Sequence, residues 1–123
     1  MVRTSIRSYR DLEVWQVAMK LAELCYEATA RFPARETYGL ASQMRRAAVS
    51  IPSNIAEGHS RKSRPAFLNH LSIALGSQAE LETQVELSGR LKLLQEPGRE
   101  EIANLAGQVG RMLHGLIRSL EGG

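Results

Sequence analysis

The chain has 123 residues, of which 43 % are hydrophobic and 5 % aromatic, and its formal net charge is +3. This length suits one domain, residues 1–123, and the scarcity of β-branched and aromatic residues favours helix over sheet. A single cysteine, Cys25, excludes an internal disulfide. There is neither a signal-peptide-like start nor an apolar run of the roughly 20 residues that span a bilayer, so we expect a cytoplasmic protein without a membrane partner.

Proline and glycine positions define the first two predicted helices. The first is expected from about residue 9 to residue 31, because the residue before Pro33 avoids the helical conformation. The second is expected over about residues 37–57, with Gly58 as a left-handed stop. Pro52 lies inside the second helix and should bend or break it, because its ring removes one hydrogen bond and clashes with the preceding turn.

The third and fourth helices begin at equally clear signals. Ser63 is a good N-cap with Pro65 in the first turn, and the third helix continues to about residue 90. Pro97 opens the fourth helix, which reaches about residue 120. Apolar residues recur at three- and four-residue spacing in the last three helices, as in amphipathic helices. Because the connections are short, we predict an all-α, antiparallel up-down-up-down four-helix bundle.

The first helix is unusual because it carries two apolar stripes on nearly opposite sides. A helix in an isolated bundle needs one apolar arc of roughly 100° or somewhat more. Deep burial in its own core would explain the second stripe, but a domain this small offers little depth. We therefore predict a homo-oligomer in which one stripe contacts another subunit. The candidate interface residues are Leu12, Trp15 and Met19 in the first stripe and Val14, Val17, Leu21 and Leu24 in the second.

One end of the predicted bundle is rich in basic residues. The antiparallel order brings together the starts of the first and third helices and the ends of the second and fourth. Basic side chains near a helix start oppose its dipole unless an anion offsets them, and helix starts also offer N–H groups to phosphate. We interpret this end as a candidate site for RNA or DNA, the alternative being a solvated loop. Its basic residues are Arg3, Arg7, Arg10, Arg61, Lys62, Arg64 and Arg118, against Asp11, Glu57 and Glu121.

Aromatic platforms for base stacking are missing from this prediction. Trp15, Tyr26 and Phe67 fall on apolar stripes and are expected in the core or an interface, which leaves only Tyr9 and Tyr38 for the surface. Nucleic-acid binding should then follow charge and shape, with little sequence readout.

Two polar segments of the second helix have structural explanations. Arg45 and Arg46 lie off its apolar stripe, and we expect them to pair with carboxylates of the third helix, within or between subunits, the alternative being a second basic site. Ser53 or Asn54 is expected to support the backbone disturbed by Pro52.

Catalytic signals are weak. The histidines, His59, His70 and His114, do not share a helix face at metal-ligand spacing, so we predict no metal, no cofactor and no enzymatic activity. Cys25 is expected to be an inert core thiol. Arg64 and His70 loosely resemble the arginine–histidine pair of some bundle ribonucleases, but their six-residue spacing places them about 120° apart on the helix.

Several segments resemble a known family. They are Asp11-Leu12-Glu13-Val14-Trp15, Phe32-Pro33, Glu36-Thr37-Tyr38-Gly39-Leu40, the run from Gln43 to Gly58, and Gly76-Ser77-Gln78-Ala79-Glu80-Leu81. In this order they resemble the four-helix-bundle proteins first described from reading frames inside intervening sequences of bacterial 23S ribosomal RNA genes. The accessory protein of diversity-generating retroelements is similar to the same family.

The resemblance implies an antiparallel bundle assembled into a ring, commonly a homopentamer, with nucleic-acid binding by a basic surface. Two classes of function follow from the sequence. One is a nucleic-acid-binding scaffold whose ring displays basic ends. The other is a protein-interaction scaffold in which nucleic acid has no role, with a ribonuclease as a distant third.

Overall fold

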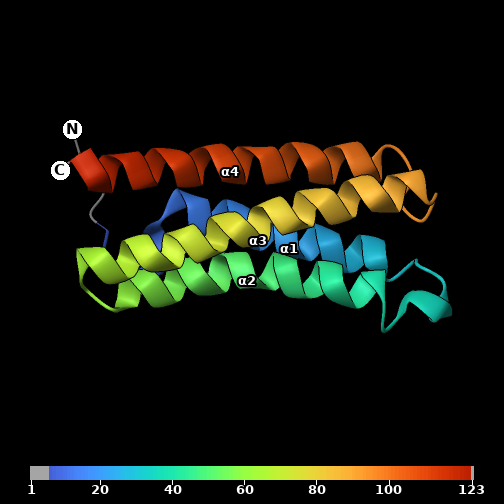
Figure 1. Cartoon of the computed structure of the whole chain (residues 1–123), viewed down its shortest axis with the longest axis horizontal. Coiled ribbons are helices and arrows are strands. Elements are labelled where there is room, and N and C mark those ends of the chain that lie inside the picture. Colours follow the sequence, from blue (N-terminus) through green and yellow to red (C-terminus); the bar gives the residue numbers. More distant parts are fainter. Residues whose placement is uncertain (1–5, 123) are drawn as a thin grey trace.

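The computed structural model describes residues 6–122 as a bundle of four α-helices (Figure 1). Consecutive helices run in opposite directions, and α1 also packs against α4, which closes the bundle. The predicted four-helix bundle is therefore confirmed. The helices are α1 (Glu13–Thr29), α2 (Leu40–Ser60), α3 (Arg64–Arg90) and α4 (Gly98–Gly122), with short 3-10 helices η1 (Tyr9–Asp11) and η2 (Ala34–Glu36).

The chain enters α1 later than predicted, because residues 8–12 form their own capped turn. The Ser8 side chain accepts a hydrogen bond from the backbone N–H of Arg10, and the Asp11 carboxylate accepts one from the N–H of Ser8. Leu12 then has extended backbone angles, so α1 begins only at Glu13. This capping box satisfies backbone donors locally and separates η1 from α1.

Pro52 does not break α2, which is continuous through it. The expectation that Gly58 ends the helix is wrong, because α2 passes Gly58 and ends at Ser60. Positive φ falls instead on Lys62, in the connection to α3. Gly58 is buried, and a Cβ placed on it would lie 2.6 Å from the Cβ of His70. The glycine is therefore needed for the close approach of α2 and α3, and helix termination does not depend on it.

The core lies on the inward faces of all four helices. Its residues lie on the apolar faces predicted for α2, α3 and α4, although Phe67, Leu75, Leu105, Met112, Leu116 and Leu120 are only partly buried. Burial raises the pKa of the Cys25 thiol to about 12, as expected for an inert core cysteine. The core includes Val14, Ala18 and Leu21 of α1, Met44, Ile51 and Ile55 of α2, Leu71, Leu81 and Val85 of α3, and Ile102, Val109 and Leu113 of α4.

A buried polar side chain, that of Gln78, joins α3 to α4, and the apolar pattern did not predict it. Gln78 is only 6 % exposed, and its side-chain amide donates a hydrogen bond of 2.9 Å to the carbonyl of Ala106. Gly110 leaves the space for this amide, because a Cβ there would lie 2.8 Å from its nitrogen.

Within residues 6–122, none of the helices combines the length and hydropathy needed to cross a bilayer.

Candidate nucleic-acid interface and oligomer surface

The two apolar stripes of α1 differ in how deeply their side chains are buried. Val14 and Leu21 of the second stripe are 5 % and 0 % exposed, and Val17 and Leu24 are partly buried against the same core. The sequence left open which stripe contacts another subunit, and side chains as buried as Val14 and Leu21 have almost no surface left for such a contact. This stripe is the core face of α1.

The first stripe lines a shallow apolar groove between α1 and α2. Met19 is 38 % exposed and Tyr26 46 %, and Val49 of α2 is 41 % exposed opposite them. Trp15 is half-buried and packs edge-on against the ring of Tyr9, with ring centroids 5.3 Å apart. Leu12 is also half-buried, against the core rather than in the groove. This α1–α2 groove is lined by Tyr9, Trp15, Met19, Ala22, Glu23, Tyr26, Val49, Pro52, Ser53 and Ala56.

The predicted basic end forms as the topology requires. The segments that carry its residues are η1 with the residues before it, the α2–α3 connection, the start of α3 and the last turns of α4. They lie at the same end of the bundle (Figure 1). Arg3 lies outside the described residues. The other six, which we call the basic end, are all exposed: Arg7, Arg10, Arg61, Lys62, Arg64 and Arg118.

Most of the positive charge at the basic end has no carboxylate partner. Among residues 6–122, only Arg61 of this set forms an ion pair, with Glu57 at 3.0 Å. Asp11 accepts from the backbone N–H groups of Arg7 and Ser8, and these bonds hold the pKa of its carboxyl below the usual value. Glu13, in the first turn of α1, also lies at this end and was not among the three acidic residues expected there from the sequence. Six basic side chains still face four acidic ones.

The start of α3 offers less to a phosphate than predicted. The Ser63 hydroxyl already accepts a hydrogen bond from the N–H of Ala66, and Pro65 has no N–H to give. Anion binding at the basic end therefore depends on its side chains rather than on the helix start.

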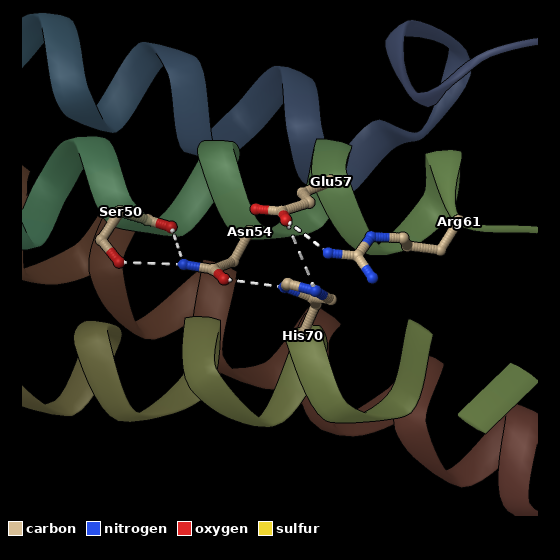
Figure 2. Close-up of polar contacts among 5 residues, drawn as sticks. All are labelled: Ser50, Asn54, Glu57, Arg61 and His70. Atoms are coloured by element: carbon tan, nitrogen blue, oxygen red, sulfur yellow. Dashed lines mark hydrogen bonds and ion pairs between the residues drawn. The ribbon is translucent and has the colours of Figure 1, made fainter. Parts of the chain in front are cut away.

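A chain of polar contacts joins α2 to α3 beside the basic end (Figure 2). Asn54 donates its amide N–H to the carbonyl and hydroxyl of Ser50, so its oxygen is the acceptor for Nδ1 of His70 at 3.0 Å. Nε2 of His70 lies 3.9 Å from Glu57, the carboxylate that also holds Arg61. The chain positions Glu57 and Arg61. The Ala48 carbonyl is the one that loses its usual donor at Pro52. Asn54 bonds the carbonyl of Ser50 instead, so this contact does not provide the support expected for the backbone disturbed by Pro52.

Arg45 does not pair with carboxylates of α3, so that prediction is wrong for contacts within the subunit. Its Nε donates to the Thr29 hydroxyl at 2.7 Å, and its terminal nitrogen donates to the Tyr26 carbonyl at 3.3 Å. Its guanidinium lies 4.6 Å from the centre of the Tyr26 ring. These contacts cap the last turn of α1. Tyr26, expected in the core or an interface, is exposed beside it, whereas Tyr9 is half-buried.

Residues 10–115 match the sequence model of the family described as 23S rRNA-intervening sequence protein. The chain belongs to this family. Among solved structures, it is similar to a protein of unknown function from the S23 ribosomal protein family of Bacteroides thetaiotaomicron. That structure shares 25 % sequence identity and a TM-score of 0.77, over 85 % of this chain and 95 % of the other. No curated protein matches the chain.

The family match bears on the candidate sites of this 23S rRNA-intervening sequence protein. The matched segment contains Arg10, Arg61, Lys62 and Arg64, whereas Arg7 and Arg118 lie outside it. The described residues contain no cluster of three metal-binding side chains. His70 instead bonds Asn54 and lies 3.9 Å from Glu57.

Proposed function

We propose that this member of the 23S rRNA-intervening sequence protein family is a non-enzymatic, homo-oligomeric scaffold that binds RNA or DNA through its basic end. The observation that carries the proposal is the gathering of six exposed basic side chains from four segments, of which one is in an ion pair among residues 6–122. Such a surface suits the phosphate backbone, whose neutralisation releases condensed counterions.

Self-association is supported by the α1–α2 groove. Its exposed Met19, Tyr26 and Val49 leave apolar surface in water, and a second copy of the chain is the occupant that we propose. The family resemblance favours five subunits. A ring would repeat the basic end around its axis, so contacts that are weak in one subunit would add up by multivalency.

The binding expected from this arrangement is electrostatic. The basic end holds guanidinium and ammonium groups, and the Arg10 guanidinium lies 4.8 Å from the centre of the Tyr9 ring. If these groups contact phosphates, the contacts carry no sequence information, and affinity should vary little with sequence. It should fall steeply with salt, with a log–log slope of about −0.9 for each duplex phosphate neutralised.

The test is a fluorescence anisotropy titration with duplex DNA and duplex RNA across a range of salt concentrations. Replacing Arg61, Lys62 and Arg64 with alanine should weaken binding and flatten the salt slope while the subunit number stays unchanged. A control variant removes the same charge from exposed positions elsewhere, with alanine at Lys20, Arg90 and Arg111. Equal slopes for the two variants would contradict a site at the basic end.

The second candidate is a scaffold that docks another protein, and the α1–α2 groove is the observation that favours it. If the purified chain is monomeric, this groove is free for a partner. Absence of association with any nucleic acid at about 50 mM salt, where non-specific electrostatic binding is strong, would make this the better proposal.

A further inference from the structure

A second group of aromatic and basic side chains lies at the opposite end of the bundle from the basic end, around a hollow between the last turn of α1 and the start of α2. Tyr38, in the turn before α2, is 96 % exposed, and Tyr26 on the other side is 46 % exposed. Tyr38 has no aromatic or cation–π partner within residues 6–122, so packing inside the subunit does not explain this ring. An exposed ring of this kind offers a face on which a base can stack.

Two arginines border the same hollow. Arg45 is held by the Thr29 hydroxyl at 2.7 Å, the Tyr26 carbonyl at 3.3 Å and the Tyr26 ring at 4.6 Å. These partners are neutral, and a guanidinium has five N–H donors, so Arg45 keeps its charge and several donors after these contacts. Arg46 is the next residue and is exposed. Among residues 6–122, neither arginine forms an ion pair with a carboxylate.

We propose that this hollow binds an unstacked nucleotide of a single-stranded nucleic acid, with the base on Tyr38 and the phosphate at Arg45 and Arg46. A nucleotide combines a planar ring and an anion, the two chemistries that the hollow presents side by side. The immobilised Arg45 has already lost side-chain freedom within the subunit, so less is lost when it binds a phosphate. Thr37, Ser42, Val49 and Ser50 complete the lining, and Tyr26 and Val49 also line the α1–α2 groove, so the nucleotide would lie beside the proposed subunit contact. The hydroxyls of Thr37 and Ser42 can bond sugar or phosphate oxygens, whereas the Ser50 hydroxyl already bonds Ser77 and Asn54.

Other ligands fit the hollow less well. An acidic peptide would use the arginines and leave Tyr38 without a partner. A duplex would reach the arginines, but its bases are already stacked and paired. The inference goes beyond the proposed function, which needs charge alone and concerns the other end of the bundle.

The test compares a labelled 15-nucleotide single strand of oligo(dT) or oligo(rU) with a duplex of equal length by fluorescence anisotropy. Tyr38→Ala should weaken single-strand binding by at least about fivefold, the low end of one lost base stack, and leave duplex binding unchanged. Tyr38→Phe keeps the ring and should bind like the wild type. Leu91→Ala, which removes another exposed apolar side chain at 56 % exposure, is the matched control.

The same titrations keep the two proposals separate. Alanine at Arg61, Lys62 and Arg64 should weaken single-strand and duplex binding together, so the ratio of single-strand to duplex affinity stays unchanged. Tyr38→Ala should weaken only single-strand binding and so lower this ratio. Unchanged single-strand binding by Tyr38→Ala would overturn the inference even if the basic end binds duplex.

Two further outcomes would also overturn the inference. Competition by free uridine or thymidine monophosphate at micromolar concentration, lost in Tyr38→Ala, would assign the hollow to a free nucleotide instead of a strand. A change of subunit number in Tyr38→Ala by light scattering would make Tyr38 a contact between copies of the chain. The expected result is that Tyr38→Ala keeps the wild-type subunit number and has a lower ratio of single-strand to duplex affinity.

Discussion

The substitution Met19→Glu tests the α1–α2 groove as the subunit interface. Met19 is 38 % exposed, so about two-fifths of the roughly 1.5–3 kcal/mol for burying a methionine remains to be gained on assembly, or about 1 kcal/mol for each copy. The substitution removes this gain and also places a carboxylate in an apolar contact, where desolvation costs several kcal/mol. A total loss of about 4 kcal/mol would weaken each contact about a thousandfold.

The assay is size-exclusion chromatography with light scattering at micromolar concentration, together with circular dichroism to confirm that the helices remain. The wild type should elute as an oligomer, and Met19→Glu should approach the subunit mass of 13.6 kDa with unchanged helix content. Gln108→Glu adds the same charge at an exposed position of α4 and should leave the oligomer intact. The reasoning is refuted if the wild type is monomeric, or if Met19→Glu keeps the wild-type mass.

The remaining predictions concern stability and reactivity. Leu71→Ala removes a fully buried core side chain and should lower the free energy of unfolding, measured with urea, by roughly 2–5 kcal/mol, whereas Leu91→Ala should change it by less than about 0.5 kcal/mol. Gly58→Ala should destabilise by about 1–3 kcal/mol, because the new methyl would lie 2.6 Å from a side-chain carbon of α3. Gly76→Ala, with nothing within 4 Å, should stabilise by about 0.5–1 kcal/mol, and the opposite order of these two glycine variants would contradict the described α2–α3 packing. Cys25, with its thiol pKa raised to about 12 by burial, should react with a thiol reagent at pH 8 only after unfolding.

The two nucleic-acid proposals differ in what could be predicted before the structure. The basic end follows from helix order alone, because antiparallel helices with short connections bring fixed segments together. The hollow near Tyr38 was missed because Tyr26 shares the spacing of an apolar stripe and because Arg45 was expected to pair with carboxylates of the neighbouring α3. Tyr38 and the neighbouring pair Arg45-Arg46 were signals of this site in the sequence. The sequence did not indicate that Arg45 would stack on Tyr26 close to Tyr38.

The sequence by itself determined that the chain forms four helices, because several of their ends depend on local chemistry. Pro33 and Pro97 interrupt the backbone, Ser63 caps the N-terminus of α3, and the apolar spacing in α3 and α4 marks an inward face. These signals act over a few residues, so they can be read without knowing what packs against the helix.

Only the tertiary structure decided which surface each ambiguous residue would face. Leu21 and Met19 are two residues apart and both apolar, yet one is 0 % and the other 38 % exposed. Helical spacing defines a stripe but not the neighbour that covers it, so the core face of α1 depends on where α2 and α4 lie. The role of Gly58 was hidden for the same reason: its missing Cβ has consequences only because His70 of α3 comes within contact distance.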